Sequence, residues 1–267
     1  MTGRWLSIVG IGGDGLDGVS PRGRMLIDGA QILVGGDRHL AMIPDDGRAR
    51  LTWPSPLTDL MPQIVERRGT PVCVLATGDP MFFGIGVTLA KHFDADEMDV
   101  VPSLSAFSLA ASRLGWALAD VEQLTLHGRP PSLMVPFIQP NARMMILSDG
   151  ADTPAQIAQV LIERGYGDSK IYVLEHMGGA QERGLEGTAA NWQHTDIAAF
   201  NTVGVDCVAG PDAIIQPRVP GLPEDAFISD GNITKREVRA ATLAALAPLP
   251  GEHLWDVGAG CGAIAIE

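Results

Sequence analysis

The chain has 267 residues, of which 46% are apolar and 19% charged, a composition that allows a large buried core and excludes a disordered protein. Its net charge is −13, which disfavours nucleic acid because affinity for a phosphate backbone comes from basic groups. The N-terminus lacks a signal peptide, and no segment approaches the ~18 apolar residues of a membrane span. We therefore expect a cytoplasmic protein that binds neither nucleic acid nor membrane.

The 3 cysteines, Cys73, Cys207 and Cys261, lie far apart and lack the spacing of a metal site. They predict free thiols and no bound metal.

Strand-like and helix-like segments alternate through the first half of the chain. Strands are expected at 5–11, 31–35, 71–78 and 97–103, and helices at 20–30, 57–69, 84–93 and 104–116. The first helix should begin with Ser20 as N-cap and Pro21 at the first helical position. Such alternation predicts a parallel sheet with helices on both faces.

A second lobe is expected after residue 117. Its strands are predicted at 122–128, 142–150, 170–179 and 202–210, with a helix over 153–167 that Thr153 caps. These segments predict a domain over 1–210 with lobes at about 1–117 and 118–210.

The texture of the sequence changes after Gly210. Four prolines over residues 211–223 predict a semi-rigid linker at 211–222. A helix over 234–249 should follow, opened by a capping box of Thr234 and Glu237, and then a strand at 253–258. Its buried face is expected to hold Val238, Ala241, Ala245 and Leu249.

The first glycine motif is "GIGGDG" at 10–15. It matches the dinucleotide fingerprint GxGxxG, and Asp37 follows where a ribose-binding acid is expected. In that fingerprint the helix begins at the loop and its N–H groups face the pyrophosphate. Here the helix should begin only at Ser20–Pro21, so a phosphate in the loop would miss it. A nicotinamide-dependent oxidoreductase is therefore kept as an alternative.

Two further motifs follow strands. "LATGDPMFFGIG" (75–86) predicts a tight turn, and "VPSLSAFSLAASRLGW" (101–116) places small residues at a helix start. Each alone fits an ordinary turn or helix cap. Small residues at strand ends also let a ligand approach the backbone.

Together and in this order, the three motifs resemble those of the tetrapyrrole (precorrin and uroporphyrinogen) methylases over about residues 5–210. The sequence departs from the family pattern at Gly13, which stands for a proline, and at Ser103, which stands for a glycine. The resemblance implies an α/β, two-lobed class III methyltransferase fold, with a mainly parallel sheet in the N-lobe and a mixed sheet in the C-lobe. It also implies S-adenosyl-L-methionine as cofactor, S-adenosyl-L-homocysteine as product, a reduced tetrapyrrole as substrate, and a homodimer.

The tail, "ITKREVR" followed by "DVGAGCG", resembles the opening of a Rossmann-like class I methyltransferase domain. That domain occurs in the branch of precorrin methylases that also decarboxylates, and "VGGDRH", "LHGRP" and "LEHMGGAQE" agree with this branch. We expect 223–267 to be its truncated start. In that branch the first domain is associated with methylation at C-5, and the second with C-15 methylation and loss of the C-12 acetate carboxyl.

The resemblance assigns residues to the cofactor and to the substrate. The expected cofactor contacts are Gly13, Gly78, Asp79, Phe82, Ser105, Ala106 and Asp149. Arg38 and Arg129 are expected to bind substrate carboxylates. His39 and His127 are candidates for hydrogen-bond partners or for the catalytic base.

These four residues also fit surface arginines and loop-capping histidines. The sequence leaves open another branch of the superfamily, such as a diphthine synthase or an rRNA 2′-O-methyltransferase. It also leaves open a catalytically inert protein that only holds tetrapyrrole.

Overall fold

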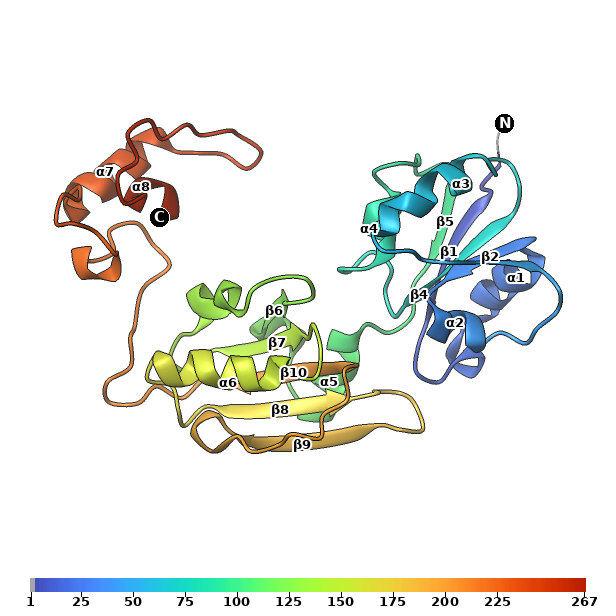
Figure 1. Cartoon of the computed structure of the whole chain (residues 1–267), viewed down its shortest axis with the longest axis horizontal. Helices are drawn as coiled ribbons and strands as arrows, with labels where there is room; N and C mark the ends of the chain where they lie inside the picture. The colour runs from blue at the N-terminus through green and yellow to red at the C-terminus, as the bar shows by residue number, and fades with distance from the viewer. Residues whose placement is uncertain (1–2) are drawn as a thin grey trace. The chain divides into compact units, whose positions relative to one another are not determined.

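A computed structural model describes residues 3–267 of the chain (Figure 1). The chain divides into two compact units, Met1–Asp212 and Ala213–Glu267. The first unit holds two five-stranded sheets, one after the other along the sequence.

The first sheet is parallel, in the order β3-β2-β4-β1-β5. Its strands are β1 (Leu6–Ile11), β2 (Ile32–Gly35), β3 (Ala49–Thr52), β4 (Val72–Thr77) and β5 (Met98–Val101). The interior strand β1 is buried along its whole length, as its apolar sequence predicts for a strand covered on both faces. The alternation of strands and helices in the sequence thus predicted four of these five strands and missed the edge strand β3.

Short helices cover both faces of this sheet. They are α1 (Pro21–Gly29), α2 (Asp37–Ala41), α3 (Met61–Val65) and α4 (Ile85–Leu89). Ile27 and Leu40, from α1 and α2, pack on one face, and Ile64 and Leu89, from α3 and α4, pack on the other. The predicted start of α1 is confirmed, because the Ser20 hydroxyl accepts a hydrogen bond from the Gly23 N–H (3.2 Å).

The second sheet is mixed, in the order β6-β7-β10-β8-β9, with only the β6–β7 pair parallel. Its strands are β6 (Glu122–Thr125), β7 (Arg143–Leu147), β8 (Lys170–Glu175), β9 (Arg183–Thr188) and β10 (Asn201–Asp206). Helix α5 (Ala106–Leu114) packs against it through a buried cluster that includes Phe107, Met145 and Leu174. The expected parallel and mixed sheets are both present.

Helix α6 (Thr153–Glu163) differs in one detail from its prediction. Asp152, not Thr153, occupies the N-cap position. The Thr153 hydroxyl instead accepts hydrogen bonds from the N–H groups of Asp149 and Gly150 (both 3.1 Å), so it closes the turn before the helix.

The second unit holds two helices, α7 (Arg236–Leu246) and α8 (Ala263–Ile266). The predicted capping box is wrong, because Lys235 is the N-cap and makes no side-chain cap. The predicted apolar face is also wrong: Arg239 and Leu243 are buried, whereas Val238 is 55% exposed.

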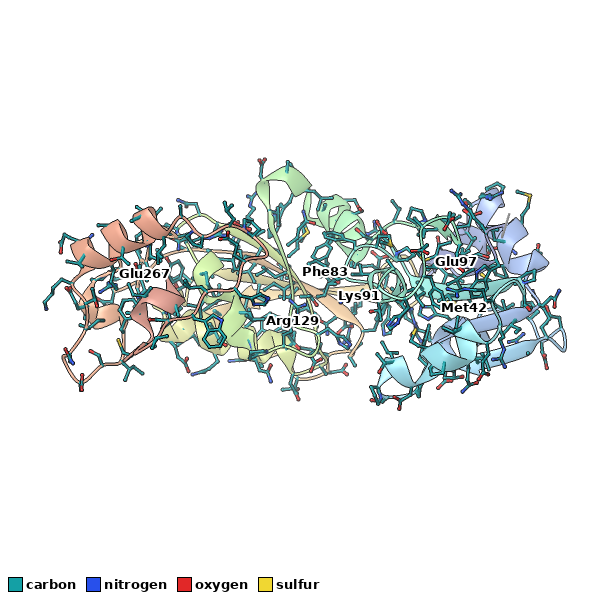
Figure 2. All side chains as sticks on the ribbon, turned by 90° about the horizontal axis from the view of Figure 1, so that it is seen from above. Met42, Phe83, Lys91, Glu97, Arg129 and Glu267 are labelled. Carbon is teal, nitrogen blue, oxygen red and sulfur yellow. The ribbon has the colours of Figure 1, made fainter. Side chains whose placement is uncertain are left out.

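Arg239 is buried because every part of its guanidinium is paired. It binds the buried Glu267 carboxylate (3.0 Å, Figure 2 labels Glu267) and the carbonyls of Thr234 and Leu222, and it lies 4.7 Å from the Phe227 ring centre. The strand expected at 253–258 does not form, and Trp255 is 86% exposed. A strand of this kind needs neighbouring strands, and none lies among residues 213–267 of the described chain.

Candidate functional site

The three sequence motifs meet at the carboxyl edge of the first sheet. Here the Gly78 N–H donates to the Ile11 carbonyl (3.2 Å), and the Ser103 N–H donates to the Gly78 carbonyl (3.0 Å). A Cβ on Gly10 would lie 1.9 Å from the Gly78 oxygen and 2.6 Å from the Ser103 nitrogen. Glycine at position 10 is therefore required for the backbones of the three motifs to touch.

Gly78 itself has φ +57°, a left-handed conformation that favours glycine. A Cβ there would lie 2.9 Å from the Leu104 carbonyl oxygen, just before the helix α5. The turn after β4 begins with the tripeptide Gly78-Asp79-Pro80 and is called the GDP-type turn below. It thus contacts the start of α5 through backbone atoms.

Gly13, in the first loop, meets a turn between β8 and β9. A Cβ on Gly13 would lie 2.8 Å from both the Gly179 nitrogen and the Met177 oxygen. There is no room for the proline that the family pattern has at this position without movement of the backbone.

Glu182 clamps the same turn. Its carboxylate accepts a hydrogen bond from the Gly178 N–H (2.7 Å) and two from Arg113 of α5 (2.6 and 2.9 Å). The Arg113 hydrogen bonds, with the Gly178 N–H, lower the pKa of Glu182 to about 2. The charged carboxylate therefore fixes the turn that supports Gly13.

Asp79 and Phe82 lie in the turn after β4. One Asp79 carboxylate oxygen accepts a hydrogen bond from the Met81 N–H (2.9 Å), so part of its role is to shape the turn. The Phe82 ring is 38% exposed and lies 5.0 Å from the ring of the buried Phe107. The contact between the Phe82 and Phe107 rings thus joins the turn after β4 to helix α5.

Ser105 and Ala106 begin helix α5. The Ser105 hydroxyl is the N-cap and accepts a hydrogen bond from the Ser108 N–H (3.1 Å). The hydroxyl is therefore committed to the helix, and what Ser105 and Ala106 offer a ligand is small size at the meeting point of the loops.

Arg38 and His39 lie beside the same turn. Both contact the hydroxyl of Thr77, the last residue of β4: Arg38 Nη2 at 3.2 Å and His39 Nε2 at 3.0 Å. The Arg38 guanidinium also lies over the Phe200 ring, 4.2 Å from its centre.

Burial, and then the positive charge of Arg38, lower the pKa of His39 to about 4. The imidazole is therefore neutral at neutral pH, and its buried Nδ1 has no hydrogen-bond partner among residues 3–267.

Asp149, His127 and Arg129 form a separate group at the ends of β6 and β7. Asp149 Oδ1 accepts a hydrogen bond from the Gly128 N–H (2.8 Å) and lies 3.3 Å from His127 Nδ1. Both side chains are exposed, as is Arg129, which Figure 2 labels. Leu147, at the end of β7 and two residues before Asp149, packs against the cluster that contains Phe107 of helix α5.

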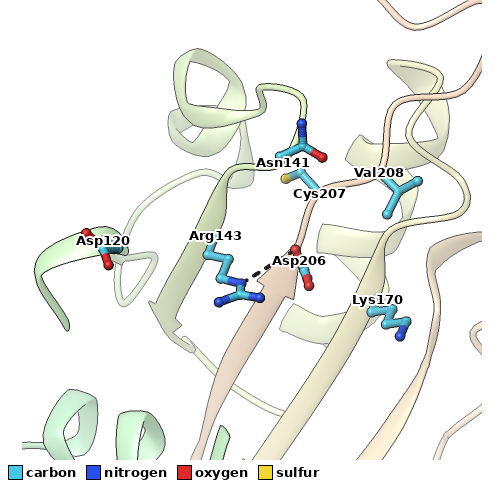
Figure 3. Close-up of a pocket in the computed structure, with 7 residues that line it drawn as sticks. All are labelled: Asp120, Asn141, Arg143, Lys170, Asp206, Cys207 and Val208. Carbon is cyan, nitrogen blue, oxygen red and sulfur yellow. Dashed lines mark ion pairs between the residues drawn. The ribbon is translucent and has the colours of Figure 1, made fainter. Parts of the chain in front are cut away.

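A hollow lies at the other end of the second sheet, near the first residue of β7 and the last residue of β10 (Figure 3). Its rim carries the ion pair Arg143–Asp206 (3.7 Å) and Lys170. It contains none of the residues that the sequence assigned to cofactor or substrate.

Across residues 3–267, no group of His, Cys, Asp and Glu side chains is arranged to hold a metal ion. Every helix in the same range is too short or too polar to cross a lipid bilayer. Cys73 and Cys207 are buried free thiols, and Cys261 is a partly exposed one.

Sequence reasoning missed several neighbours of the site. Thr77 and Phe200 give Arg38 and His39 their environment, and the Met177–Gly179 backbone supports Gly13. The paired glycines in "HMGG" were a signal of close backbone approach, whereas nothing local in the sequence marks Phe200.

The fold and these converging motifs are those of the tetrapyrrole-methylase type. The chain belongs to the tetrapyrrole (corrin/porphyrin) methylase family, whose model matches residues 6–192. Residues 225–267 match a precorrin methyltransferase domain.

Among curated relatives, the precorrin-6Y C(5,15)-methyltransferase (decarboxylating) of Sinorhizobium sp is 44% identical over 265 residues, which are 98% of this chain and 64% of the relative. The Mycobacterium tuberculosis protein of the same name is 40% identical over 97% of this chain and 65% of its own length. The chain thus spans about two thirds, 64–65%, of the length of these relatives.

A shorter relative, the cobalt-precorrin-7 C(5)-methyltransferase of Salmonella typhimurium, is 32% identical over 178 residues, 67% of this chain and 88% of that protein. A solved precorrin-6Y methylase from Archaeoglobus fulgidus shares the fold, with TM-score 0.59, 24% identity, and coverage of 77% of this chain and 99% of that one. A diphthine synthase shares it too, with TM-score 0.58, 16% identity, and coverage of 76% and 89%.

Proposed function

We propose that this chain methylates a reduced precorrin at C-5, with S-adenosyl-L-methionine as the methyl donor, in cobalamin biosynthesis. The observation that carries this proposal is the difference in length between two kinds of relative. The relative named for C-5 alone matches 178 residues of this chain, whereas those named for both C-5 and C-15 are longer than the chain. The C-5 activity accordingly belongs to the first unit.

The residues at the carboxyl edge of the first sheet fit this cofactor. Glycines bring three loops into backbone contact, and exposed apolar side chains, Met81, Phe82 and Leu104, adjoin them. Small residues give an adenosine access to backbone groups, and the apolar side chains suit its base. When bound, the cofactor supplies an already activated methyl group, so the protein needs no nucleophile of its own.

The work left to the chain is to orient the substrate and to exclude water, which can supply up to ~7–11 kcal/mol of barrier reduction. Arg38, beside the GDP-type turn, supplies a planar donor for a substrate carboxylate. Arg129, on the exposed loop after β6, supplies a second.

Methylation at a carbon of the macrocycle displaces a proton, which a protein base can accept. His39 is a poor base for this purpose, because its pKa of about 4 leaves it little affinity for a proton at neutral pH. His127 suits the role better, since its ring is exposed and the Asp149 carboxylate, 3.3 Å from its Nδ1, can orient it. We therefore assign His127 as the candidate base and His39 as a neutral hydrogen-bonding neighbour of the substrate.

We further propose that C-15 methylation and decarboxylation belong to the domain that residues 225–267 begin. The second unit contains one helical pair and no sheet among its described residues, so it does not itself form a class I methyltransferase fold. The nicotinamide alternative is disfavoured because helix α1 begins at Pro21, after a separate turn at Leu16–Gly18, and does not face the glycine loop.

Titration calorimetry with S-adenosylhomocysteine and with NADH tests the cofactor. We expect binding of the former and none of the latter; NADH binding without S-adenosylhomocysteine binding would contradict the proposal.

Asp79→Ala should weaken S-adenosylhomocysteine binding with the fold intact. Asp45→Ala is the matched control, because Asp45 makes the same type of turn, to the Gly47 N–H (3.2 Å), away from the proposed site. Equal affinities in the two variants would remove Asp79 from the site.

A further inference from the structure

Three phenylalanine rings form a cluster beside the GDP-type turn, in which each ring contacts the other two. Phe107 is buried, Phe82 is 38% exposed and Phe83 is 46% exposed. The Phe82 ring centre lies 5.0 Å from those of both Phe107 and Phe83, and the Phe82 and Phe83 planes are only 26° apart. Phe83, labelled in Figure 2, is thus the most exposed ring of a cluster that the buried Phe107 anchors in the core.

Phe83 has a backbone conformation that is unfavourable for its residue type. Its φ is +56°, in the left-handed region that glycine adopts at no steric cost. Such strain persists where the surroundings enforce it, and it is concentrated at functional sites.

The turn around Phe83 is well fixed. The Met81 N–H donates to the Asp79 carboxylate (2.9 Å), the Phe82 N–H to the Asp79 carbonyl (3.2 Å), and the Gly86 N–H to the Pro80 carbonyl (2.9 Å). The strained residue therefore holds an aromatic ring outward on a rigid turn.

Exposed apolar side chains and one cation belong to the segments that meet at this turn. Met81 (46% exposed) and Leu104 (64% exposed) extend the apolar surface. Arg38, bound to the Thr77 hydroxyl, supplies a guanidinium where the same turn begins. Exposed aromatic rings on a turn that begins at a fixed cation are suited to a flat, conjugated molecule that carries carboxylates at its edge.

We propose that Phe83 is a substrate-positioning residue, on which a face of the conjugated tetrapyrrole stacks while Arg38 binds one of its carboxylates. This inference rests on the proposed function and adds to it the surface that orients the macrocycle. Phe82 supports Phe83, because the two rings are stacked with their centres 5.0 Å apart.

The test measures two ligands on each variant of the full chain. Uroporphyrin, a stable conjugated tetrapyrrole with carboxylates, is titrated by fluorescence quenching, and S-adenosylhomocysteine by calorimetry. The variants are Phe83→Gly, which removes the ring and suits the positive φ, and Phe83→Leu, which keeps an apolar side chain. Met25→Ala is the control, because Met25 is a 61% exposed apolar residue of α1.

We expect Phe83→Gly to bind uroporphyrin about tenfold more weakly, Phe83→Leu to lie between it and the wild type, and Met25→Ala to match the wild type. S-adenosylhomocysteine affinity should stay within about twofold in every variant. Unchanged uroporphyrin affinity in Phe83→Gly would overturn the inference. An equal loss of affinity for both ligands in Phe83→Gly would also overturn it, because Phe83 would then be a cofactor contact. So would a sedimentation coefficient of Phe83→Gly that differs from that of the wild type, because a second copy of the chain would then cover the ring. A wild-type chain that binds neither ligand would instead overturn the proposed function.

Discussion

Gly10→Ala tests whether the three loops must touch for the site to exist. The added methyl carbon would enter the space between the Gly78 oxygen (1.9 Å) and the Ser103 nitrogen (2.6 Å), two atoms that share a hydrogen bond of 3.0 Å. Both obstacles are backbone atoms, so no side-chain rotation relieves the clash, and the strand ends must separate.

The cost can be worked from these contacts. Loss of the Ser103–Gly78 hydrogen bond costs about 0.5–1.5 kcal/mol. Overpacking against rigid backbone adds about 1–3 kcal/mol. We expect a loss of about 1.5–4.5 kcal/mol in the free energy of unfolding, hence a Tm lower by about 3–18 °C in a domain of this size.

The assays are urea denaturation followed by circular dichroism, and calorimetric titration with S-adenosylhomocysteine. The ligand should bind at least about tenfold more weakly to the folded variant, because the loops that form its site no longer meet. Gly35→Ala is the matched control: Gly35 also ends a strand of this sheet, and its Cβ would meet ordinary contacts of 3.4 Å or more. A Gly10→Ala protein as stable as the Gly35→Ala control, with unchanged ligand affinity, would refute the reasoning.

Three further predictions concern charge. The pKa of Glu182 is lowered to about 2, so the stability that its carboxylate contributes is present above the unfolded pKa of about 4.5 and is lost as the pH falls towards 2. The difference in Tm between the wild type and Glu182→Gln should therefore shrink from pH 6 to pH 3, and a constant difference would contradict this. The pKa of His39 is lowered to about 4, so the fold favours the neutral ring and the contribution of His39 to stability falls as the pH drops from about 6.5 to 4. An NMR titration of this imidazole should have its midpoint well below pH 6, and a midpoint at pH 6 or above would be inconsistent with the burial of the ring. Arg239→Met leaves Glu267 buried without its cation, which should destabilise the second unit by about 3–5 kcal/mol. Limited proteolysis should then cleave residues 213–267 while the first unit resists, and equal resistance of both units would argue against a stabilising role for the Arg239–Glu267 ion pair.

The sequence predicted those parts of the fold that depend on local patterns. Continuous apolar segments such as 5–11 form strands buried on both faces, and the Ser20–Pro21 pair begins a helix for reasons of cap chemistry alone. The edge strand β9 was missed because "RGLEGT" has little apolar alternation and gains its ladder from β8 only. The strand predicted at 253–258 failed for the opposite reason, since its apolar pattern has no neighbouring strand to pair with among the described residues.

The candidate site was predicted in part for the same reason. Glycines at 10, 13 and 78 signal close backbone approach, and the structure gives each a backbone neighbour that a Cβ would strike. The environment of Arg38 could not be foreseen, because Phe200 reaches it only through the packing of the whole first unit. Arg239 was missed because a charged residue normally marks the exposed face of a helix, and its burial depends on Glu267, far along the chain.

The most direct test of the account is methyl transfer itself. The chain is incubated with a reduced precorrin and with S-adenosylmethionine that carries a ¹³C-labelled methyl group, and the product is analysed by NMR. We predict that one labelled methyl group appears at C-5, and that C-15 and the C-12 acetate are unchanged. A label at another position, or no label in a preparation that binds both ligands, would contradict the assignment of C-5 methylation to this chain.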